Sequence, residues 1–506
     1  MDPKSIFGNE LPRRALSKAR RTFKAMARRF SFDPDTYPRL AAEPMPGAFD
    51  AFGVMKLEER RSDPSAGEPN RAVDPDSGIV LGTIRMGFGH YRIGLAIASA
   101  ARSMGLTPYW LDLMSFPDSA ASKTIKYLED LYNLGSRLSQ NSRFFDRYVW
   151  ERITAETAKR LSYTARDRAL SELFEPILRD LPKDAPFMST HPWTGQAAVR
   201  AGLDSVVALI PDNYPLAFHL VEGAVHTVQA PSLYMGYRTL RDMGGGEELF
   251  HALPKDDIRC VGHYVDHEIV SAVEEDCAAR LKRLRDKETR RFLLTMGGAG
   301  AQARRFADIA HSCKGAIEKG AVSLLINMGD HAGRWAELRA WLEADGIPFE
   351  LHQDWEATKA FTEEIRVGPV KGVHVFLHDT FFAAVYTTNI LMRVVDVMIT
   401  KPSELSVYPV PKLFIQHVGA HEVWGAIRGS ELGDGTIETE SDASLRQALR
   451  LLVEEDDLIE MYCGNILRNA RSGIYDGAYG AVHLALERRA DAARADAARD
   501  DAARAK

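Results

Sequence analysis

A glycine-containing stretch that ends in a histidine is the first feature of the sequence that could carry chemistry. It reads Gly87-Phe-Gly89-His90 and follows a short apolar segment. Glycines let a ligand approach the backbone closely, and the start of a following helix offers unpaired amides at the positive end of its dipole. A histidine there can act as a general base near neutral pH. Two roles stay open for His90, a general base or a cap of the loop; in the first case Gly87 and Gly89 would contact the acceptor of its reaction.

A second glycine-rich turn follows another apolar segment and contains Gly297, Gly298, Ala299 and Gly300. No Lys-Ser or Lys-Thr pair comes after it, so the turn is not an ATP-type phosphate loop. Successive backbone amides at the start of a helix can still hold a diphosphate without a metal ion. The plain alternative is a tight turn between a strand and a helix. Two such turns in one chain favour the phosphate interpretation.

Polar residues also follow two later apolar segments. Lys401 offers a point cation, and Ser403 and Glu404 come directly after it. A carboxylate such as that of Glu404 can accept hydrogen bonds from two hydroxyl groups of a sugar or ribose. His421 and Glu422 follow the next segment. We expect these residues to bind a donor, with a place in surface loops as the alternative.

A third group of polar residues ends two consecutive strands of the first half of the chain. His191 precedes a proline, whereas Asp212 and Asn213 follow one. The carboxyl ends of parallel strands meet at one edge of a sheet, so these side chains should project toward His90. We expect Asp212 to orient His90 or to bind an acceptor hydroxyl, and His191 and Asn213 to contact the acceptor. Turn formation is the alternative for Asp212 and Asn213.

Neither a metal site nor a bound cofactor is predicted. His417 and His421 are four residues apart, but Gly419 would interrupt a helix between them and no third ligand recurs. The four cysteines are scattered, without the spacing of a metal site or a disulfide framework. Free thiols in a reducing compartment are therefore expected.

The elements that must position these residues alternate between short apolar strands and helices. Such strand–helix–strand units are typical of parallel, doubly wound sheets, whose ligands bind at the carboxyl edge. The predicted strands of the first half are 78–84, 107–112, 186–190, 205–211 and 257–265, and those of the second half are 290–296, 321–327, 373–377, 397–400 and 412–415. This pattern predicts an α/β protein with two Rossmann-like domains that meet at a central cleft.

The chain divides by composition into five parts. They are a basic amphipathic segment (1–33), a linker rich in Pro, Asp, Gly and Ala (34–77), a first α/β domain (78–265), a second α/β domain with a final helix that could return to the first (266–489), and an Asp/Ala/Arg tail (490–506). A length of 506 residues exceeds what one hydrophobic core usually organises, which agrees with two domains.

Charge and hydropathy restrict the partners and the location. The net charge of −6 argues against general nucleic-acid binding. No apolar stretch is long enough to span a membrane and no secretory signal is evident, so a cytoplasmic protein is expected. Residues 1–30 carry nine Lys or Arg residues and an apolar stripe that includes Leu16, Phe23 and Met26. Such a helix can lie on the anionic inner face of the cell membrane, or it can dock on the protein or form a disordered arm.

The order and spacing of these motifs over residues 78–430 resemble a glycosyltransferase family of the GT-B fold. That family contains monogalactosyldiacylglycerol synthase, processive diacylglycerol glycosyltransferases and the N-acetylglucosaminyltransferase of peptidoglycan synthesis. The similar motifs are the stretch ending at His90, Ser189-Thr-His-Pro192, Pro211-Asp212, Met296 to Gly300, Asp396 to Pro402, and Gly419 to Glu422.

The resemblance implies a sugar transferred from a nucleotide-diphosphate donor, a UDP-sugar, to a lipid-linked hydroxyl acceptor. It implies donor binding by the second domain, acceptor binding by the first, and inverting, metal-independent chemistry. One departure concerns the family's ribose-binding glutamate on a helix after Lys-Pro-Gly-Gly. Here Ser403 to Pro411 contains two prolines that leave little room for that helix. Either Glu404 replaces the missing glutamate or donor binding differs.

Three functions therefore remain open. The first is a hexosyltransferase in which His90 takes the proton of the acceptor. The second is a nucleotide-sugar epimerase or hydrolase of the same fold, which needs no acceptor. The third is a catalytically silent protein that binds nucleotide sugars or a membrane surface.

Overall fold

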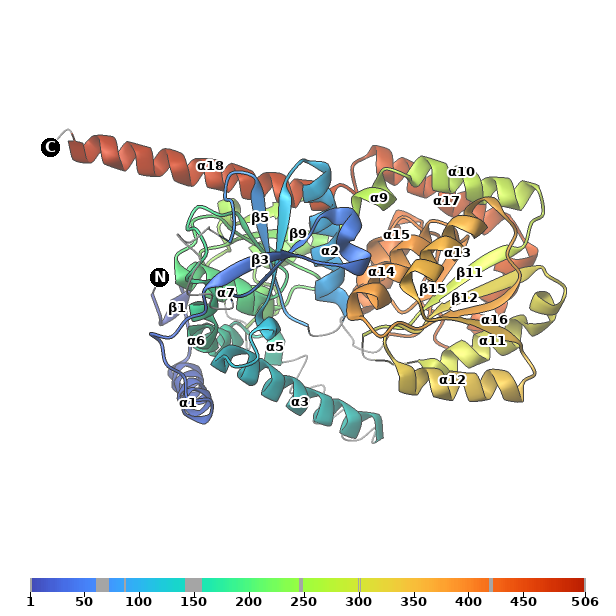
Figure 1. Ribbon diagram of the computed structural model, residues 1–506, viewed down its shortest axis with the longest axis horizontal. Helices are drawn as coiled ribbons and strands as arrows, with labels where there is room; N and C mark the ends of the chain where they lie inside the picture. The colour runs from blue at the N-terminus through green and yellow to red at the C-terminus, as the bar shows by residue number, and fades with distance from the viewer. Residues whose placement is uncertain are drawn as a thin grey trace.

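The computed structural model describes residues 2–60, 72–85, 88–141, 157–244, 249–298, 300, 302–417 and 422–504. These residues form two lobes side by side, each with a largely parallel β-sheet covered by helices (Figure 1). The predicted α/β class with two Rossmann-like, doubly wound domains is confirmed, and it is the two-domain organisation of a GT-B-type fold. The central cleft between the domains stays a prediction, and the loops that would border it are in contact.

The sheet of the first lobe has eight strands in the order β10-β9-β8-β7-β5-β6-β4-β3. Every neighbouring pair is parallel except β3 with β4. All six residues of β5 are buried, as expected where helices cover both faces of a parallel sheet. The strands are β3 (Leu40–Pro44), β4 (Met55–Glu59), β5 (Gly78–Thr83), β6 (Thr107–Asp112), β7 (Phe187–Ser189), β8 (Val206–Leu209), β9 (Val225–Val228) and β10 (Ile258–Cys260).

Residues 34–77, predicted to be a linker, contain regular structure in their described part (34–60 and 72–77). This segment contributes β3 and β4 to the sheet, and η1 (Gly47–Phe52) between them places Phe49 and Phe52 in the core. The strands are short and interrupted by prolines and glycines, so no alternating pattern extends far enough to reveal them. Their strand conformation depends on pairing with β6, which a local pattern does not show.

The sheet of the second lobe has six parallel strands in the order β13-β14-β12-β11-β15-β16. They are β11 (Arg290–Thr295), β12 (Val322–Asn327), β13 (Phe349–His352), β14 (Gly372–Phe376), β15 (Val397–Thr400) and β16 (Lys412–Phe414). Strand β13 was not predicted, and neither was β9 in the first sheet. Both have only four residues and contain polar side chains, so each lacks a long apolar run.

Helices connect the strands and cover the faces of both sheets (Figure 1). Those of the first lobe are α1 (Arg13–Arg29), α2 (Phe88–Ser103), α3 (Ala120–Asn141), α5 (Thr157–Lys159), α6 (Thr164–Phe174), α7 (Pro192–Ala201) and α8 (Pro231–Arg238). Those of the second lobe are α9 (His267–Val270), α10 (Val273–Arg285), α11 (Ala303–Glu318), α12 (Ala332–Ala344), α13 (Trp355–Val367), α14 (Phe381–Met392), α15 (Val423–Leu432), α16 (Asp442–Glu454) and α17 (Asp457–Arg471). A short hairpin of β1 (Ser5–Ile6) and β2 (Asn9–Glu10) precedes α1.

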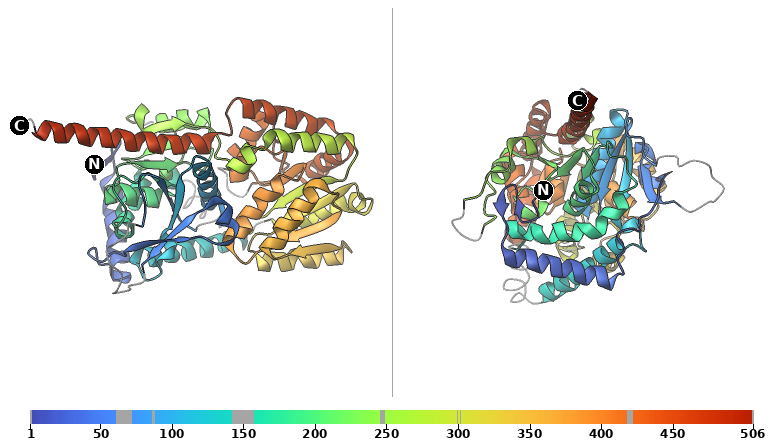
Figure 2. Two further views of the ribbon diagram at one scale, coloured as in Figure 1. Left: turned by 45° about the horizontal axis from the view of Figure 1, so that its top comes forward. Right: turned by 90° about the vertical axis from the view of Figure 1, so that its left-hand side faces the viewer.

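The chain crosses between the lobes twice. Residues 261–266 join β10 to α9, close to the predicted boundary near residue 265. The final helix α18 (Gly477–Arg504) then returns along the first lobe, as Figures 1 and 2 show. Ser205 donates a hydrogen bond from its hydroxyl to the carbonyl oxygen of Ala485 at 2.8 Å. The last helix therefore lies along the first lobe, and residues 490–499 near its end are mostly exposed.

Helix α1 lies against α6 on the outer side of the first lobe (Figure 2). Its apolar residues pack into the protein, with Leu16, Phe23 and Met26 at the margins of two hydrophobic clusters. Arg20 forms an ion pair with Glu172 of α6 at 2.9 Å. Helix α1 is therefore docked on the protein, and its apolar stripe is covered by protein. No helix in the described ranges combines the length and the apolar character needed to cross a bilayer.

Candidate functional site

The residues that follow β5, β7 and β8 meet at one edge of the first sheet. These strands are neighbours and run parallel, so their carboxyl ends lie together. His90 lies in the first turn of α2, which follows β5; Thr190 and His191 follow β7, and Asp212 follows β8. The predicted gathering of His90, His191 and Asp212 at the carboxyl edge is therefore what the topology produces.

The imidazole of His90 is held by a backbone carbonyl. Its Nδ1 lies 2.6 Å from the carbonyl oxygen of Thr190. A carbonyl oxygen only accepts hydrogen bonds, so this contact places the proton on Nδ1 and leaves a lone pair on Nε2. The pKa of His90 is lowered, because the effect of burial is larger than the opposite effects of the Thr190 carbonyl and of Asp212. The ring is therefore neutral at pH 7 and able to accept a proton.

His191 supports the ring of His90 from the protein interior. Its residue is 2 % exposed, and the centres of the two rings are 4.8 Å apart. The Nδ1 of His191 accepts a hydrogen bond from the backbone amide of Trp193 at 3.2 Å and so caps α7. Burial and the nearby His90 hold the pKa of His191 well below its usual value. We expected an acceptor contact at His191, but the structure assigns it a capping and packing position.

Asp212 pairs with a histidine that the sequence did not single out. Its Oδ2 lies 2.9 Å from Nε2 of His219, which is 4 % exposed. The carbonyl of Thr190, and not Asp212, is therefore the hydrogen-bond partner of Nδ1 of His90, while the charge of Asp212 acts on His90 from a distance. Asn213 follows, and its buried Oδ1 has no hydrogen-bond partner within the described part of the chain. That oxygen suits the contact with an acceptor hydroxyl predicted for Asn213.

The glycine turn of the second lobe follows β11 and precedes α11. Gly300 has a φ of +63°, a conformation that favours glycine. Nε2 of His331 lies 3.0 Å from the carbonyl oxygen of Gly297, so the imidazole of His331 donates this hydrogen bond. The side chain of Lys401 packs directly against Gly297: a Cβ atom placed on this glycine would lie only 2.9 Å from Cε of Lys401. The turn thus combines the start of a 16-residue helix, a cation and a histidine.

Two predicted donor contacts are occupied by other partners. Lys401 forms an ion pair with Glu422, and both side chains are mostly buried. Ser403, next to them, donates its amide to the carbonyl oxygen of Lys401 at 2.8 Å. Glu404 lies 3.9 Å from Nε of Arg92, a residue of α2 in the other lobe. Glu404 therefore faces the first lobe beside Gly89, which disagrees with the expected ribose contact.

Backbone geometry around Glu404 agrees with the sequence. Only the short 3-10 turn η9 (Glu404–Val407) forms after Lys401. The next strand, β16, begins at Lys412. The prediction that two prolines leave no room for a ribose-binding helix is thus confirmed.

Phe88 connects the two glycine turns across the domain interface. Its ring centre is 5.6 Å from that of His331 and 4.9 Å from that of Phe381. The ring also lies above Gly329, where a Cβ would come within 2.9 Å. Arg85, just before the first turn, is 3.4 Å from Asp330. The turn at Gly89–His90 and the turn at Gly297–Gly300 therefore face each other, with His331 in contact with both sides.

Three predicted site residues, Gly87, Ala299 and His421, lie outside the described residues. Four further residues belong to the site although the sequence did not indicate them: Thr190, His219, His331 and Arg92. Each acts through a partner more than six residues away, and Arg92 contacts Glu404 from 312 positions earlier. The signals in the sequence were that Thr190 ends a predicted strand within the motif Ser189-Thr-His-Pro192 and that His331 comes four residues after another predicted strand.

Two family models match the chain in sequence. Residues 5–239 match the model described as "Domain of unknown function (DUF6937)", and residues 253–486 match "Domain of unknown function (DUF6938)". The first match lies within the first lobe, and the second covers the second lobe together with β10 and the first part of α18. No protein of curated function matches the chain.

Solved structures with a similar arrangement include the following three enzymes. The α,α-trehalose 6-phosphate synthase of Burkholderia multivorans is 13 % identical with a TM-score of 0.43, covering 82 % of this chain and 99 % of its own. A glycosyltransferase of Rickettsia africae is 10 % identical with a TM-score of 0.37, covering 81 % and 98 %. The UDP-GlcNAc 2-epimerase of Neisseria meningitidis bound to UDP-GlcNAc is 11 % identical with a TM-score of 0.38, covering 81 % and 99 %. At these values the similarity assigns no activity to the chain.

Proposed function

We propose that the protein transfers a sugar from a nucleotide-diphosphate donor, a UDP-sugar, to a hydroxyl acceptor, with inversion and without a metal ion. The observation that carries this proposal is the imidazole of His90. Its Nδ1 is held by the Thr190 carbonyl and its Nε2 keeps a lone pair. His90 lies in the first turn of α2, whose Phe88 contacts His331 beside the turn at Gly297. A proton acceptor opposite an anion-binding turn is what such a transfer requires.

In the proposed reaction, Nε2 of His90 takes the proton of the acceptor hydroxyl. The acceptor oxygen forms a bond to the anomeric carbon, and the bond from that carbon to the diphosphate breaks. The nucleoside diphosphate leaves with the bonding electrons, and Lys401, His331 and the first amides of α11 stabilise its charge. Asn213 and the backbone near Gly89 would contact the acceptor.

Substitution of His90 tests this assignment. His90→Ala should reduce acceptor-dependent release of nucleoside diphosphate by about 10²- to 10⁴-fold, because general-base catalysis contributes about that much. Donor affinity, measured by calorimetry with UDP-sugars, should change less than about threefold. His311→Ala is the matched control, because this histidine is 69 % exposed and far along α11 from the turn. Equal activity of His90→Ala and the wild-type protein would refute the assignment.

The ion pairs at the donor turn support a second candidate, a catalytically silent protein that binds nucleotide sugars by contacts other than those expected of a transferase. Lys401 is engaged by Glu422, and Glu404 by Arg92, so neither carboxylate is directed at a ribose. A panel of nucleotide sugars with a membrane lipid extract separates the candidates. Release that depends on the acceptor supports transfer, release without acceptor supports hydrolysis or epimerisation, and binding alone supports the second candidate.

A lipid-linked acceptor is the further part of the proposal, and α1 supports it. Although the apolar stripe of this helix is covered, its outer side exposes a row of cations: Arg13, Arg14, Lys18, Arg21, Lys24 and Arg28. Each cation near an anionic headgroup surface adds about 1 kcal/mol to binding. The protein would therefore reach a lipid acceptor at the inner face of the cell membrane by electrostatic contact.

Neutralising this row is a sharper test than deleting the helix, because deletion would uncover the apolar surface under α1. Replacing Arg13, Arg14, Lys18 and Arg21 by Gln should lower binding to anionic vesicles by at least about tenfold at low salt and less at high salt. Replacing Arg334, Arg339, Lys319 and Lys359 of the second lobe is the control. Equal vesicle binding by all three proteins would exclude α1 as the membrane contact.

A further inference from the structure

Three side chains with metal-ligating atoms lie together on the second sheet, away from the glycine turn. Glu350 and His352 belong to β13, and His374 belongs to β14. Residues two apart on a strand share a face of the sheet, and Glu350 is the direct neighbour of His374 in the parallel register. All three side chains therefore project from the same face. Strands β14 and β12 separate β13 from β11, which carries the glycine turn.

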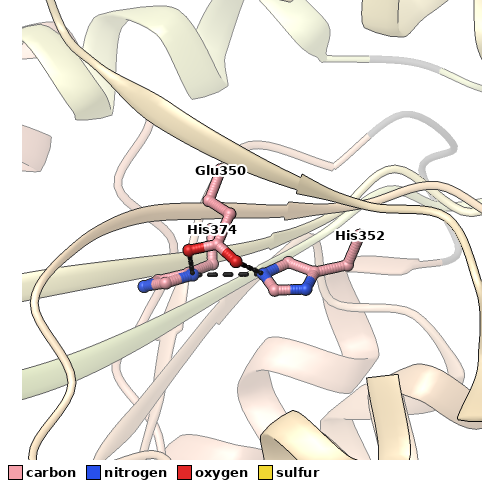
Figure 3. Close-up of side chains that lie close together, drawn as sticks. All are labelled: Glu350, His352 and His374. Carbon is pink, nitrogen blue, oxygen red and sulfur yellow. Dashed lines mark hydrogen bonds and ion pairs between the residues drawn. The ribbon is translucent and has the colours of Figure 1, made fainter. Parts of the chain in front are cut away.

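The ligand atoms of the three residues lie close together. Nε2 of His352 is 3.1 Å from Nδ1 of His374, and each carboxylate oxygen of Glu350 approaches one ring: Oε1 is 3.7 Å from Nε2 of His352, and Oε2 is 3.5 Å from Nδ1 of His374. One ligand atom from each residue can be chosen so that all three lie within 4.8 Å of one another. Figure 3 shows the carboxylate turned toward the facing nitrogen atoms of both rings. In a tetrahedral Zn²⁺ site with bonds of about 2.0–2.1 Å, neighbouring ligand atoms are about 3.3 Å apart. The observed separations lie around this value.

The surroundings hold both imidazoles in this orientation. Nε2 of His374 donates a hydrogen bond to the carbonyl oxygen of Lys371 at 3.0 Å, which leaves the lone pair of its Nδ1 for a metal. The ring of His352 stacks on Phe376 with centres 4.8 Å apart, and Phe361 lies 4.6 Å from His374. Such a ring orientation set by a carbonyl is the usual support of a metal-bound histidine.

Two of the three ligand side chains are buried, and the third is exposed to solvent. The side chains of His352 and His374 are 8 % and 10 % exposed, whereas that of Glu350 is 64 % exposed. The structure records no ion pair of Glu350, within its described residues, other than those with the two histidines. An ion can therefore enter from solvent, and water can take its fourth position.

From this geometry we infer that Glu350, His352 and His374 form a Zn²⁺ site with three protein ligands and one water. Two imidazoles and a carboxylate are a known zinc ligand set. Binding requires that His352 carry its proton on Nδ1, so that both facing nitrogen atoms coordinate the metal. The ion would join β13 to β14. This link would hold β13 in place, because β13 is a four-residue edge strand that pairs with β14 alone in its sheet. This site is independent of the proposed sugar transfer.

Titration of the purified full chain with Zn²⁺ alone tests the site. We expect one tightly bound Zn²⁺ and a higher melting temperature on its addition, which chelation reverses. Glu350→Gln should weaken binding by at least about tenfold and abolish the rise in melting temperature. This variant should fold, because the side chain is mostly exposed. Glu356→Gln is the matched control, since Glu356 is exposed on α13 and pairs with Lys359.

The chain has 15 histidines, so the variant His374→Ala tests whether the bound ion lies at this site and not at another histidine. It should lose the tight ion, and Co²⁺ bound to the wild-type protein should give the visible absorption of a tetrahedral site that the variant lacks. Loss of the ion in both ligand variants but not in Glu356→Gln supports the inference. Equal Zn²⁺ affinity in the wild type, Glu350→Gln and His374→Ala, or no Zn²⁺ binding by the wild type, would overturn it.

Discussion

At the scale of single residues, the state of His90 decides what the site can do. Its ring is oriented by a backbone carbonyl and packed on the buried ring of His191. Glycosyl transfer needs a base that is neutral before the reaction and that points toward the acceptor. His90 meets the first condition because burial lowers its pKa.

The lowered pKa of His90 predicts a particular dependence of activity on pH. Only the neutral imidazole accepts a proton, so kcat/KM should be constant near pH 7 and above. It should fall, at most tenfold per pH unit, as the pH drops through a value below 6.5, the ordinary pKa of the group. A pH–rate profile with UDP-sugar as donor measures this limb. An acid limb with its midpoint above 6.5 would contradict the assignment of His90.

At the scale of elements, a buried ion pair fastens the last strand to the carboxy-terminal part of the second lobe. Nζ of Lys412 on β16 lies 2.9 Å from Oδ1 of Asp434, and both side chains are fully buried. Lys412 also donates to the carbonyl oxygens of Tyr408 and Val410, and Tyr475 donates its hydroxyl to Asp434. These bonds offset part of the desolvation of both charges; burial still lowers the pKa of Lys412 and raises that of Asp434.

Removing one partner of this pair should strongly destabilise the protein. Lys412→Met leaves Asp434 buried without its cation, which costs about 3–5 kcal/mol of the free energy of unfolding. Urea denaturation measures the loss. Lys282→Met is the control, because Lys282 forms a comparable pair with Asp286 at 64 % exposure, and exposed pairs contribute about 0–1 kcal/mol. A similar loss in both variants would show that burial of the pair is unimportant.

At the scale of the whole molecule, α18 and the contacts around α2 join the two lobes. The side chain of Arg92 on α2 is 3 % exposed and forms an ion pair with Glu404 of the other lobe. Phe88 packs on Phe381 of that lobe. Helix α18 begins in the second lobe and buries Ala481, Val482 and other residues in the core of the first. The relative position of the two glycine turns therefore depends on these long-range contacts.

Two truncations of α18 should differ in their effect on the free energy of unfolding, because one removes only its exposed end and the other also removes its buried part. Removing residues 490–506 should change the free energy of unfolding by less than about 0.5 kcal/mol, because that end is solvent-exposed. Ending the chain before Ala478 should cost several kcal/mol, since the core side chains of α18 are lost. Urea denaturation followed by tryptophan fluorescence compares the two. Equal stability of both truncated chains would disprove the anchoring role of α18.

The sequence alone determined the α/β class, most strands of both sheets and the edge at which His90, His191 and Asp212 meet. The predicted bounds of β6 and β15 coincide with the structure, because apolar runs between turn residues are a local pattern. The parallel topology then followed from the alternation of strands and helices, and with it the common edge of the strand ends.

Only the tertiary structure decided which side chains pair. It docked α1 on α6, added β3 and β4 to the sheet, and directed Glu404 to Arg92 and Lys401 to Glu422. It also brought Glu350, His352 and His374 together from two strands whose pairing the sequence did not reveal. The physical reason is that the apolar periodicity of a helix or strand depends on residues close together in the sequence. Pairing between distant residues depends on how whole elements pack, and a single sequence carries no local signal for it.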